Sequence, residues 1–422
     1  MRIETQCVQA GYQPENGQPR ILPIYQSTTY KYDSAEHLGK LFDLSVPGHM
    51  YTRISNPTVE MVENKIAALE GGVGAMLTSS GQAANLLAVL NIASAGDNIV
   101  CASAIYGGTI NLFGFTLKRL GIEARFFTPE ATDEEISALF DERTRLVFGE
   151  TVANPALIVC DIERLARIAH AHSVPLVIDN TFPTPVLCRP IEFGCDIVVH
   201  STTKYMDGHA SVVGGCIVDS GNFDWEKAGK YPELTEPDES YHGVVYTKSF
   251  GRATYINKAR AQLMRDFGCT PQPIAAFILN LGLESLAVRM ERHCENAQAV
   301  AEYLEKHSKV SWVNFPGLAS SPQHALAQKY LPNGVCGVIS FGVKGGREAA
   351  MKFMDSLRLA QIVVHVADAR TSVLHPASTT HRQLTDEQLV DAGISADLVR
   401  LSVGIENIED ILEDLEQAFK KI

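Results

Sequence analysis

Between about residues 58 and 258 the chain alternates amphipathic helical segments with short, continuously apolar runs. Such runs are typical of strands buried on both faces of a parallel sheet, because helices then cover the sheet on either side. The segment 161–170 has Asp161 as a helix N-cap, Glu163 in the first turn and apolar residues at 162, 165 and 168/169, so we expect a crossover helix of a βαβ unit. The expected strands are Gly74–Thr78, Asn98–Ala102, Arg145–Gly149, Leu176–Asp179 and Asp196–His200.

The flanking segments follow other patterns, and 422 residues exceed one ordinary core. Residues 1–57 show no sustained period, which predicts an arm that packs on something else. Residues 259–422 combine a helical stretch, strand candidates at 337–343 and 399–403, and a closing amphipathic helix. We therefore predict a large α/β domain at 58–258 with a mostly parallel sheet and a smaller α+β domain at 259–422. The acidic, proline-punctuated insert 231–239 is expected to be a loop.

Composition excludes several classes of partner. A formal net charge of −13, without a run of Lys or Arg, opposes nucleic acid. No apolar stretch reaches the roughly 18 residues of a membrane span. The nine cysteines are scattered, with neither a C-x-x-C pair nor a Cys/His cluster at zinc spacing, so we expect reduced thiols and no metal. Reduced thiols and the lack of an apolar signal at the N-terminus indicate a cytoplasmic protein.

Lys204 follows a predicted buried strand and three hydroxyl residues, Ser201, Thr202 and Thr203. Open α/β sheets bind ligands at the carboxyl ends of their strands. Ser201 and Thr203 can donate to a phosphate, while Lys204 can form an imine with an aldehyde and then carry protons. The alternative is a solvated lysine in a polar loop. A serine nucleophile of the β-lactamase type is excluded, because the chain has neither S-D-N nor K-T-G.

Asp179 ends an earlier predicted strand, twenty-five positions before Lys204. A carboxylate at this place can pair with a protonated pyridine nitrogen and make the ring an electron sink. By itself an aspartate at the end of a strand is more often a cap or a turn former. The combination with Lys204 favours the pyridine hypothesis.

Phosphate donors and a stacking ring are also present. Ser80, Gly81 and Gln82 lie where a predicted strand meets a helix, and backbone amides at a helix N-terminus bind phosphate. Tyr106 follows another strand and can lie flat against a pyridine ring; the alternative is an ordinary core or surface aromatic. The glycines at 72 and 74 are only a fragment of a dinucleotide fingerprint and precede their strand, so we discount NAD.

Together these motifs resemble, over essentially the whole chain, the γ-subfamily of fold type I enzymes that use pyridoxal 5'-phosphate (PLP). This is the Cys/Met-metabolism family of cystathionine synthases and lyases, methionine γ-lyases and O-acetylhomoserine sulfhydrylases. The resemblance implies a fold type I transferase in which Lys204 carries PLP as a Schiff base, Asp179 pairs with the pyridine nitrogen and Tyr106 stacks on the ring. The residues implied at the phosphate are Ser80, Gly81, Gln82, Ser201 and Thr203.

The resemblance also implies residues outside these motifs. Asn154 matches the residue near the phenolic oxygen of the cofactor, and Arg400 matches the clamp on the substrate's α-carboxylate, a task suited to a bidentate guanidinium. Tyr51 and Arg53 match residues that reach the phosphate of a neighbouring subunit. The implied active unit is a dimer, commonly paired into a tetramer.

Three features favour the sulfhydrylases within the family. The segment 375–384 resembles theirs in its Thr-Thr-His-Arg ending, and so does the insert continuing through 240–244. Gly108 stands where methionine γ-lyases carry a cysteine. One departure is His365, in His-Val-Ala-Asp where sulfhydrylases usually have Asn-Val-Gly-Asp; because this strand borders the substrate carboxylate, we expect His365 to bind substrate.

The implied reaction is γ-replacement: O-acetyl-L-homoserine and sulfide, or a small thiol, give L-homocysteine, or methionine, and acetate, with Lys204 and Tyr106 moving protons. The same residues can serve a γ-lyase, which releases ammonia and a 2-oxo acid, or a cystathionine γ-synthase. A non-catalytic scaffold is disfavoured, because Lys204, Asp179, Tyr106 and Arg400 are all present.

Overall fold

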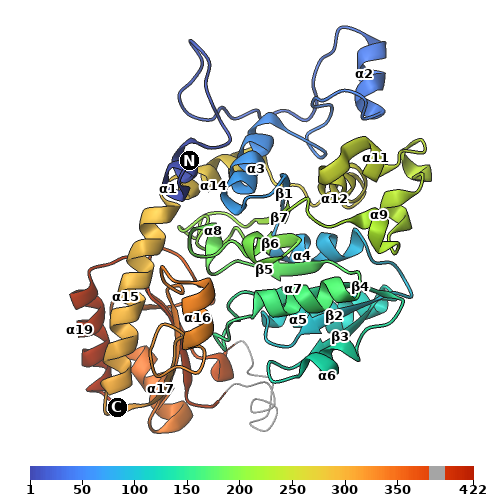
Figure 1. The fold of residues 1–422 in the computed structure, drawn as a ribbon. Coiled ribbons are helices and arrows are strands. Elements are labelled where there is room, and N and C mark those ends of the chain that lie inside the picture. Colours follow the sequence, from blue (N-terminus) through green and yellow to red (C-terminus); the bar gives the residue numbers. More distant parts are fainter. Residues whose placement is uncertain (380–394) are drawn as a thin grey trace.

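The structure, a computed structural model, describes residues 1–379 and 395–422 (Figure 1). Within these residues a seven-stranded sheet has the order β1-β7-β6-β5-β4-β2-β3, and a five-stranded sheet has the order β10-β11-β12-β9-β8. The strands of the large sheet are β1 Gly74–Thr78, β2 Asn98–Ala102, β3 Glu123–Phe127, β4 Thr144–Glu150, β5 Leu176–Asp179, β6 Ile197–His200 and β7 Gly215–Asp219. Those of the small sheet are β8 Val310–Asn314, β9 Val338–Val343, β10 Gln361–Ile362, β11 Ser372–Leu374 and β12 Leu398–Ser402.

Helices surround both sheets, and an N-terminal arm extends beyond α3 at the top of Figure 1. The first half of the chain contains α1 Ile3–Gln9, α2 Ala35–Phe42, α3 Pro57–Glu70, α4 Gly81–Leu90, α5 Gly107–Asn111, α6 Asp133–Ser137, α7 Ile162–Ala171 and α8 Thr184–Leu187. The second half contains α9 Trp225–Ala228, α10 Pro232–Thr235, α11 Tyr246–Phe250, α12 Thr254–Lys258, α13 Arg265–Phe267, α14 Pro273–Glu284, α15 Leu286–Lys306, α16 His324–Tyr330, α17 Gly346–Asp355 and α19 Ile408–Phe419.

The large sheet is mostly parallel, as predicted. Strands β2 to β6 run parallel to one another, whereas β7 is antiparallel to both β1 and β6. The sequence analysis did not identify β7. The carboxyl ends of β4, β5 and β6 therefore meet at one edge of the sheet, and the ends of β1 and β6 point the same way on either side of β7.

Both faces of the large sheet are buried. Val147 belongs to one apolar core, while its neighbours Leu146 and Phe148 belong to a second core on the opposite face. The first core also contains residues of α3 and α7, and the second contains residues of α4. Because alternate residues point into different cores, the run 146–149 is apolar at every position, and this continuous run allowed the strand to be predicted from the sequence. The first core continues into the small sheet through Ile339 and Phe341 of β9.

Several local predictions are confirmed. Helix α7 begins after Asp161, whose side chain accepts from the Arg164 amide at 3.4 Å. The closing helix α19 buries Ile411, Leu415 and Phe419 on its predicted face. The five strands predicted in the large sheet and the two in the small one are all present, with ends shifted by at most one residue.

Two local predictions are wrong. The insert 231–239 is not simply a loop, because it contains α10, and Tyr231 and Leu234 within it are fully buried. Its proline starts a turn of helix rather than interrupting one, which is the position proline tolerates best. The arm also contains two short helices, α1 and α2, that its sequence pattern did not indicate.

The division at 258/259 remains a prediction. One helical run passes through this boundary from α12 to α13, and Ala259, Leu263 and Met264 pack in the core of the large sheet. Within the described ranges no single helix is long and apolar enough to cross a membrane. Helices α14 and α15 together have the length and apolar composition of a membrane span, but the pair is bent by 59°. Leu283, Leu286 and Val300 of this pair are buried in the core of the protein.

Candidate active site

Three strand ends bring the predicted site residues together. Glu150 of β4 pairs with Asp179 of β5, and Asp179 pairs in turn with Val199 of β6. Directly after β6 the chain turns: the Lys204 amide donates to the Ser201 carbonyl at 3.3 Å, and the Gly208 amide donates to the Lys204 carbonyl at 2.8 Å. This turn keeps Lys204 at the carboxyl edge of the sheet, as its sequence position predicts.

The Lys204 amine has an unusual environment. Burial and the Arg400 cation lower the pKa of Lys204 to about 8, while Asp368 acts in the opposite direction. A neutral amine is the nucleophile that attacks an aldehyde, so this environment favours imine formation near neutral pH. The pKa does not identify the residue by itself, because burial also lowers the pKa of Lys258 to about 8, and its Nζ is bound to the Asn91 carbonyl at 2.9 Å.

Asp179 is buried and oriented. Its Oδ1 accepts from the Thr181 amide at 3.0 Å and from the Thr181 hydroxyl. Burial raises the pKa of Asp179, and these hydrogen bonds oppose the shift. The Thr181 hydroxyl also accepts from the Ser201 amide at 2.9 Å, so it joins the Asp179 strand end to the segment that leads to Lys204. Burial disfavours the charged form of an isolated carboxylate, so a carboxylate fixed in this way is a suitable partner for a buried cation, which would favour its charged form.

A cradle for an anion lies between the start of α4 and Ser201. Ser80 is the N-cap of α4, and its hydroxyl accepts from the Ala83 amide at 3.1 Å. A Cβ on Gly81 would lie 2.6 Å from the Ser201 Cβ, so only glycine permits this approach. Thr203 lies beside the cradle and exchanges hydrogen bonds with the backbone of Gly214, donating at 3.1 Å and accepting at 3.0 Å.

Tyr106 and Gln82 lie against each other over Gly108. A Cβ on Gly108 would meet Tyr106 Cε1 at 2.5 Å and Gln82 Nε2 at 2.6 Å. Tyr106 is 48% exposed, which leaves much of the side chain accessible to a ligand. Gln82 Oε1 is buried without a hydrogen-bond partner, and it is therefore a free acceptor inside the site.

Arg400 reaches the same region from β12. It is 8% exposed, and its guanidinium donates to Asn154 Oδ1 at 3.4 Å and to the Val364 carbonyl at 3.1 Å. Burial lowers the pKa of Arg400 to about 10, which still leaves it cationic at neutral pH. Arg400 and Asn154 thus offer a cation and an amide side by side.

His365 follows Val364, whose carbonyl accepts from Arg400, and it lies in electrostatic range of Lys204. Its Nε2 is buried without a hydrogen bond and lies 3.6 Å from Asp368 Oδ2. Burial, then the Lys204 cation, lowers the pKa of His365, and Asp368 opposes this. The imidazole is consequently neutral at neutral pH, with one nitrogen free for a ligand.

Tyr51 and Arg53 lie apart from this cluster, on the arm. The Arg53 Cζ is 5.2 Å from the centroid of the Tyr51 ring, and the Arg53 side chain is near Gly268. Among residues 1–379 and 395–422, neither side chain is hydrogen-bonded to a predicted site residue of its own chain. The Thr-Thr-His-Arg motif falls partly on Thr380, His381 and Arg382, which lie outside the described residues.

Glu150 belongs to the site, and the sequence analysis did not single it out. It is 6% exposed, and its Oε2 accepts from the Tyr106 amide at 2.6 Å. Burial and the neighbouring Asp179 raise the pKa of Glu150 well above its usual value. The available signal was its position, because it ends an apolar strand just as Asp179 does.

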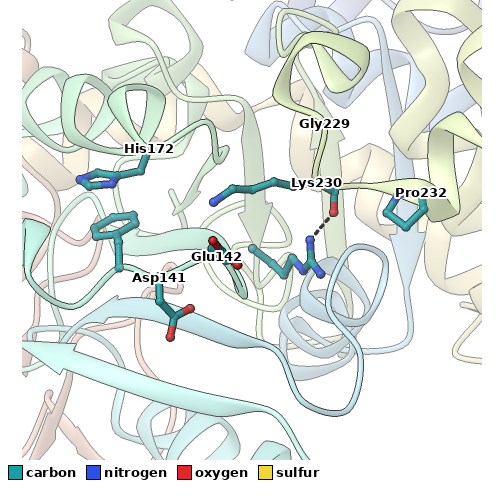
Figure 2. Close-up of a pocket in the computed structure, with 8 residues that line it drawn as sticks. Asp141, Glu142, His172, Gly229, Lys230 and Pro232 are labelled. Atoms are coloured by element: carbon teal, nitrogen blue, oxygen red, sulfur yellow. Dashed lines mark hydrogen bonds between the residues drawn. The ribbon is translucent and has the colours of Figure 1, made fainter.

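A cavity in the described part of the chain lies elsewhere (Figure 2). Its volume is about 660 Å³, and it is lined by Phe140, Asp141, Glu142, Arg145, His172, Gly229, Lys230 and Pro232. These residues include those that lead into the amino ends of β4 and β5, whereas Lys204 follows the carboxyl end of β6. The Arg145 guanidinium donates to the Lys230 carbonyl there, so these two groups of the cavity wall already bind each other. We assign the chemistry to the Lys204 cluster, because the convergent buried charges lie there.

Comparisons with known proteins show the family of the chain. Residues 4–420 match the model of the family described as Cys/Met metabolism PLP-dependent enzymes. The chain is 48% identical to homocysteine synthase of Schizosaccharomyces pombe, covering 99% of this chain and 98% of that protein. It is also 48% identical to O-acetyl-L-homoserine sulfhydrylase 1 of Thermus thermophilus, covering 99% and 100%.

A solved structure is similar throughout. A protein of Campylobacter jejuni assigned as an O-acetylhomoserine (thiol)-lyase superposes with a TM-score of 0.95 at 36% identity, covering 100% of both chains. That structure contains N'-pyridoxyl-lysine-5'-monophosphate. The fold type I prediction is thereby confirmed. The family match over nearly the whole length, together with these full-length relatives, shows that the chain belongs to the Cys/Met metabolism family of PLP-dependent enzymes.

Proposed function

We propose that this enzyme converts O-acetyl-L-homoserine and sulfide, or a small thiol, into L-homocysteine, or methionine, and acetate. The observation that carries the proposal is the convergence of the partly buried Lys204 with the buried Asp179 and Arg400 at one edge of the large sheet. Full-length relatives named homocysteine synthase and O-acetyl-L-homoserine sulfhydrylase support this choice within the family.

The residues present fit PLP. Lys204 would hold its aldehyde carbon, Asp179 its protonated pyridine nitrogen, and Tyr106 the face of its ring. The helix start at Gly81 and Gln82, with Ser80 and Ser201, would hold the phosphate, and Thr203 would join them by releasing the bond that its hydroxyl donates to the Gly214 carbonyl. One observation supports this fit: the Gly81–Ser201 approach leaves no room for a side chain between them, so a ligand can lie close to the backbone amides at the start of α4. When bound, PLP supplies an electron sink for the bonds at the substrate's Cα.

The chain's own groups then position substrate and move protons. Arg400 binds the α-carboxylate, Asn154 orients the Arg400 guanidinium, and His365, next to the Val364 carbonyl that accepts from Arg400, borders the same end of the substrate. Lys204 takes the Cα proton, and Lys204 with Tyr106 serves the proton transfer at Cβ that allows acetate to leave Cγ. Sulfide then bonds to Cγ, and the protons return to Cβ and Cα.

Product analysis tests the reaction. With PLP-loaded protein and O-acetylhomoserine, we expect homocysteine and acetate in equal amounts only when sulfide is present. Formation of 2-oxobutyrate and ammonia at the same rate with and without sulfide would instead establish the γ-lyase alternative. Cystathionine as the main product with cysteine as the added thiol would favour the cystathionine γ-synthase alternative.

We also propose that the active unit is a dimer, paired into a tetramer. Tyr51 is 43% exposed on the arm, and within the described residues its side chain is hydrogen-bonded to no residue of the Lys204 cluster. Ile21, Ile24 and Tyr25 on the same arm are exposed apolar side chains. Such a surface fits coverage by a second copy. Tyr51 and Arg53 would then reach the phosphate of the neighbouring subunit.

Subunit complementation tests this arrangement. Arg53→Ala and Lys204→Ala chains, each expected to be nearly inactive, should regain activity when co-expressed, because one site of a hybrid dimer keeps both residues. Random pairing gives about one quarter of the wild-type sites. A chain carrying both substitutions, co-expressed with Lys204→Ala, is the matched control and should stay inactive. Absence of recovery in isolated hybrid dimers would show that Arg53 does not act across subunits.

The cytoplasm is the compartment we propose for the enzyme. The nine cysteines are all free, and six of them are buried in the protein. Thiols that remain unpaired in this way suit a reducing compartment.

A further inference from the structure

We propose that Glu150 is a positioning residue that holds Tyr106 and Asn154 in the geometry required for catalysis. The proposal rests on the proposed function for its kinetic consequences. Its structural consequences concern only the bound cofactor and can be measured without substrate. Neither the resemblance nor the comparisons assign a role to this residue.

The geometry places Glu150 at the junction of two loops. Its Oε2 accepts from the Tyr106 amide, 2.6 Å away, and the same carboxyl group accepts from the Asn154 amide. The two loops belong to different strands, because Tyr106 follows β2 and Asn154 follows β4. One buried carboxyl group thereby fixes the relative position of a ring-stacking side chain and an amide side chain.

Each of these residues continues into a different part of the site. The Tyr106 ring lies over Gly108 and beside Gln82 at the cofactor cradle. Asn154 Oδ1 accepts from Arg400, which we assign to the substrate carboxylate. Glu150 is therefore the point at which the cofactor side and the substrate side of the site are held together.

The charge state of Glu150 follows from its neighbours. Glu150 and Asp179 are paired residues of adjacent parallel strands, and Glu150 has no basic partner among its contacts in the described residues. Two ionised carboxylates at this spacing repel each other strongly when buried. Burial and Asp179 raise the pKa of Glu150 well above its usual value, while at Asp179 the hydrogen bonds from Thr181 oppose the effect of burial. We therefore expect Glu150 to be the neutral member of the pair and Asp179 the anion. Glutamine has the shape of a neutral glutamic acid side chain and keeps its carbonyl oxygen as an acceptor.

The test compares three substitutions with a matched control. Glu150→Gln keeps the shape and one acceptor, Glu150→Leu removes both acceptors, and Glu150→Asp withdraws the carboxyl group by one methylene. The control is Asp196→Asn, a change of another buried carboxylate in the large-sheet domain, which accepts from the Leu176 amide at 2.8 Å at the amino end of β6. Visible circular dichroism of the PLP-loaded proteins, without substrate, reports the contact between the Tyr106 ring and the cofactor.

We expect Glu150→Gln to keep the dichroism and to stay within about threefold of the wild-type kcat, since only a small displacement follows. Glu150→Leu should change the dichroism and lower kcat by roughly 10²-fold, because displacement of reacting groups by about 1 Å has an effect of this size. Asp196→Asn should leave the dichroism unchanged. If Glu150→Leu does not fold, Glu150→Asp takes its place, and we expect it too to change the dichroism and to lower kcat.

Two results would overturn the proposal. One is a folded Glu150→Leu or Glu150→Asp protein with wild-type dichroism and kcat. The other is Glu150→Gln losing as much as Glu150→Leu, which would show that the negative charge is used rather than the acceptor. Dichroism that follows the expected order in a protein without sulfhydrylase activity would leave this inference intact and remove the proposed function.

Discussion

Replacing Lys204 by alanine is expected to reduce kcat/KM by roughly 10⁴-fold or more, because one amine both binds the cofactor and moves the Cα proton. The substitution removes the amine whose pKa is lowered to about 8 by burial and by Arg400. A second readout is independent of turnover. Borohydride reduction should attach a pyridoxyl group to the Lys204 peptide of the wild type and leave the corresponding peptide of the variant unlabelled.

Lys258→Met is the matched control for this experiment. Lys258 is 3% exposed, and burial lowers its pKa to about 8 as well, but it lies in α12 and is bound to Asn91. We expect this variant to be labelled at Lys204 as the wild type is. Labelling of Lys204→Ala at another lysine, with activity retained, would show that Lys204 is not the attachment site.

Replacing Asp179 by asparagine is expected to lower kcat by roughly 10²- to 10³-fold, the size typical for loss of one preorganised electrostatic group. The amide keeps the shape and can still accept from Thr181, but it cannot balance a positive charge on the pyridine nitrogen. The KM for O-acetylhomoserine should change less than kcat, because Arg400 and Asn154 are untouched. Steady-state kinetics together with the pH dependence of the cofactor absorbance would measure both effects.

Asp219→Asn provides a control of the same kind. Asp219 is 2% exposed, ends β7 and accepts at 2.8 Å from the amide two residues later, as Asp179 does. Because β7 is antiparallel to β6, its end lies at the opposite edge of the sheet. Its substitution should affect stability alone. An Asp179→Asn enzyme within threefold of the wild-type kcat would contradict the proposed pairing with the ring.

Most of the fold was predictable because the parallel strands are buried on both faces. The runs 146–149 and 176–178 are apolar throughout, and α7 between them has a clear cap and an amphipathic period. Fourteen residues without a helix separate β6 from β7, so the pattern of alternating strands and helices did not predict β7. The short helices of the arm and insert depend on contacts with distant segments, which no local period records.

The site was predictable where function needs a particular residue after a strand. Lys204, Asp179 and Ser201 were found because each follows or ends an apolar run. Glu150 was missed, since its importance comes from accepting the Tyr106 amide, which is 44 positions away in sequence. The contact between Arg400 and Asn154 spans 246 positions and could be inferred only from resemblance.

Gly108 restricts the order in which this sequence can evolve. Any side chain at this position would overlap the Tyr106 ring and Gln82, at 2.5 Å and 2.6 Å from a Cβ. A cysteine at this position, as expected of methionine γ-lyases, would require the Tyr106 ring and the end of the Gln82 side chain to move away together. A change at Gly108 is therefore coupled to the side-chain conformations of Tyr106 and Gln82, which is epistasis between neighbouring residues of one site.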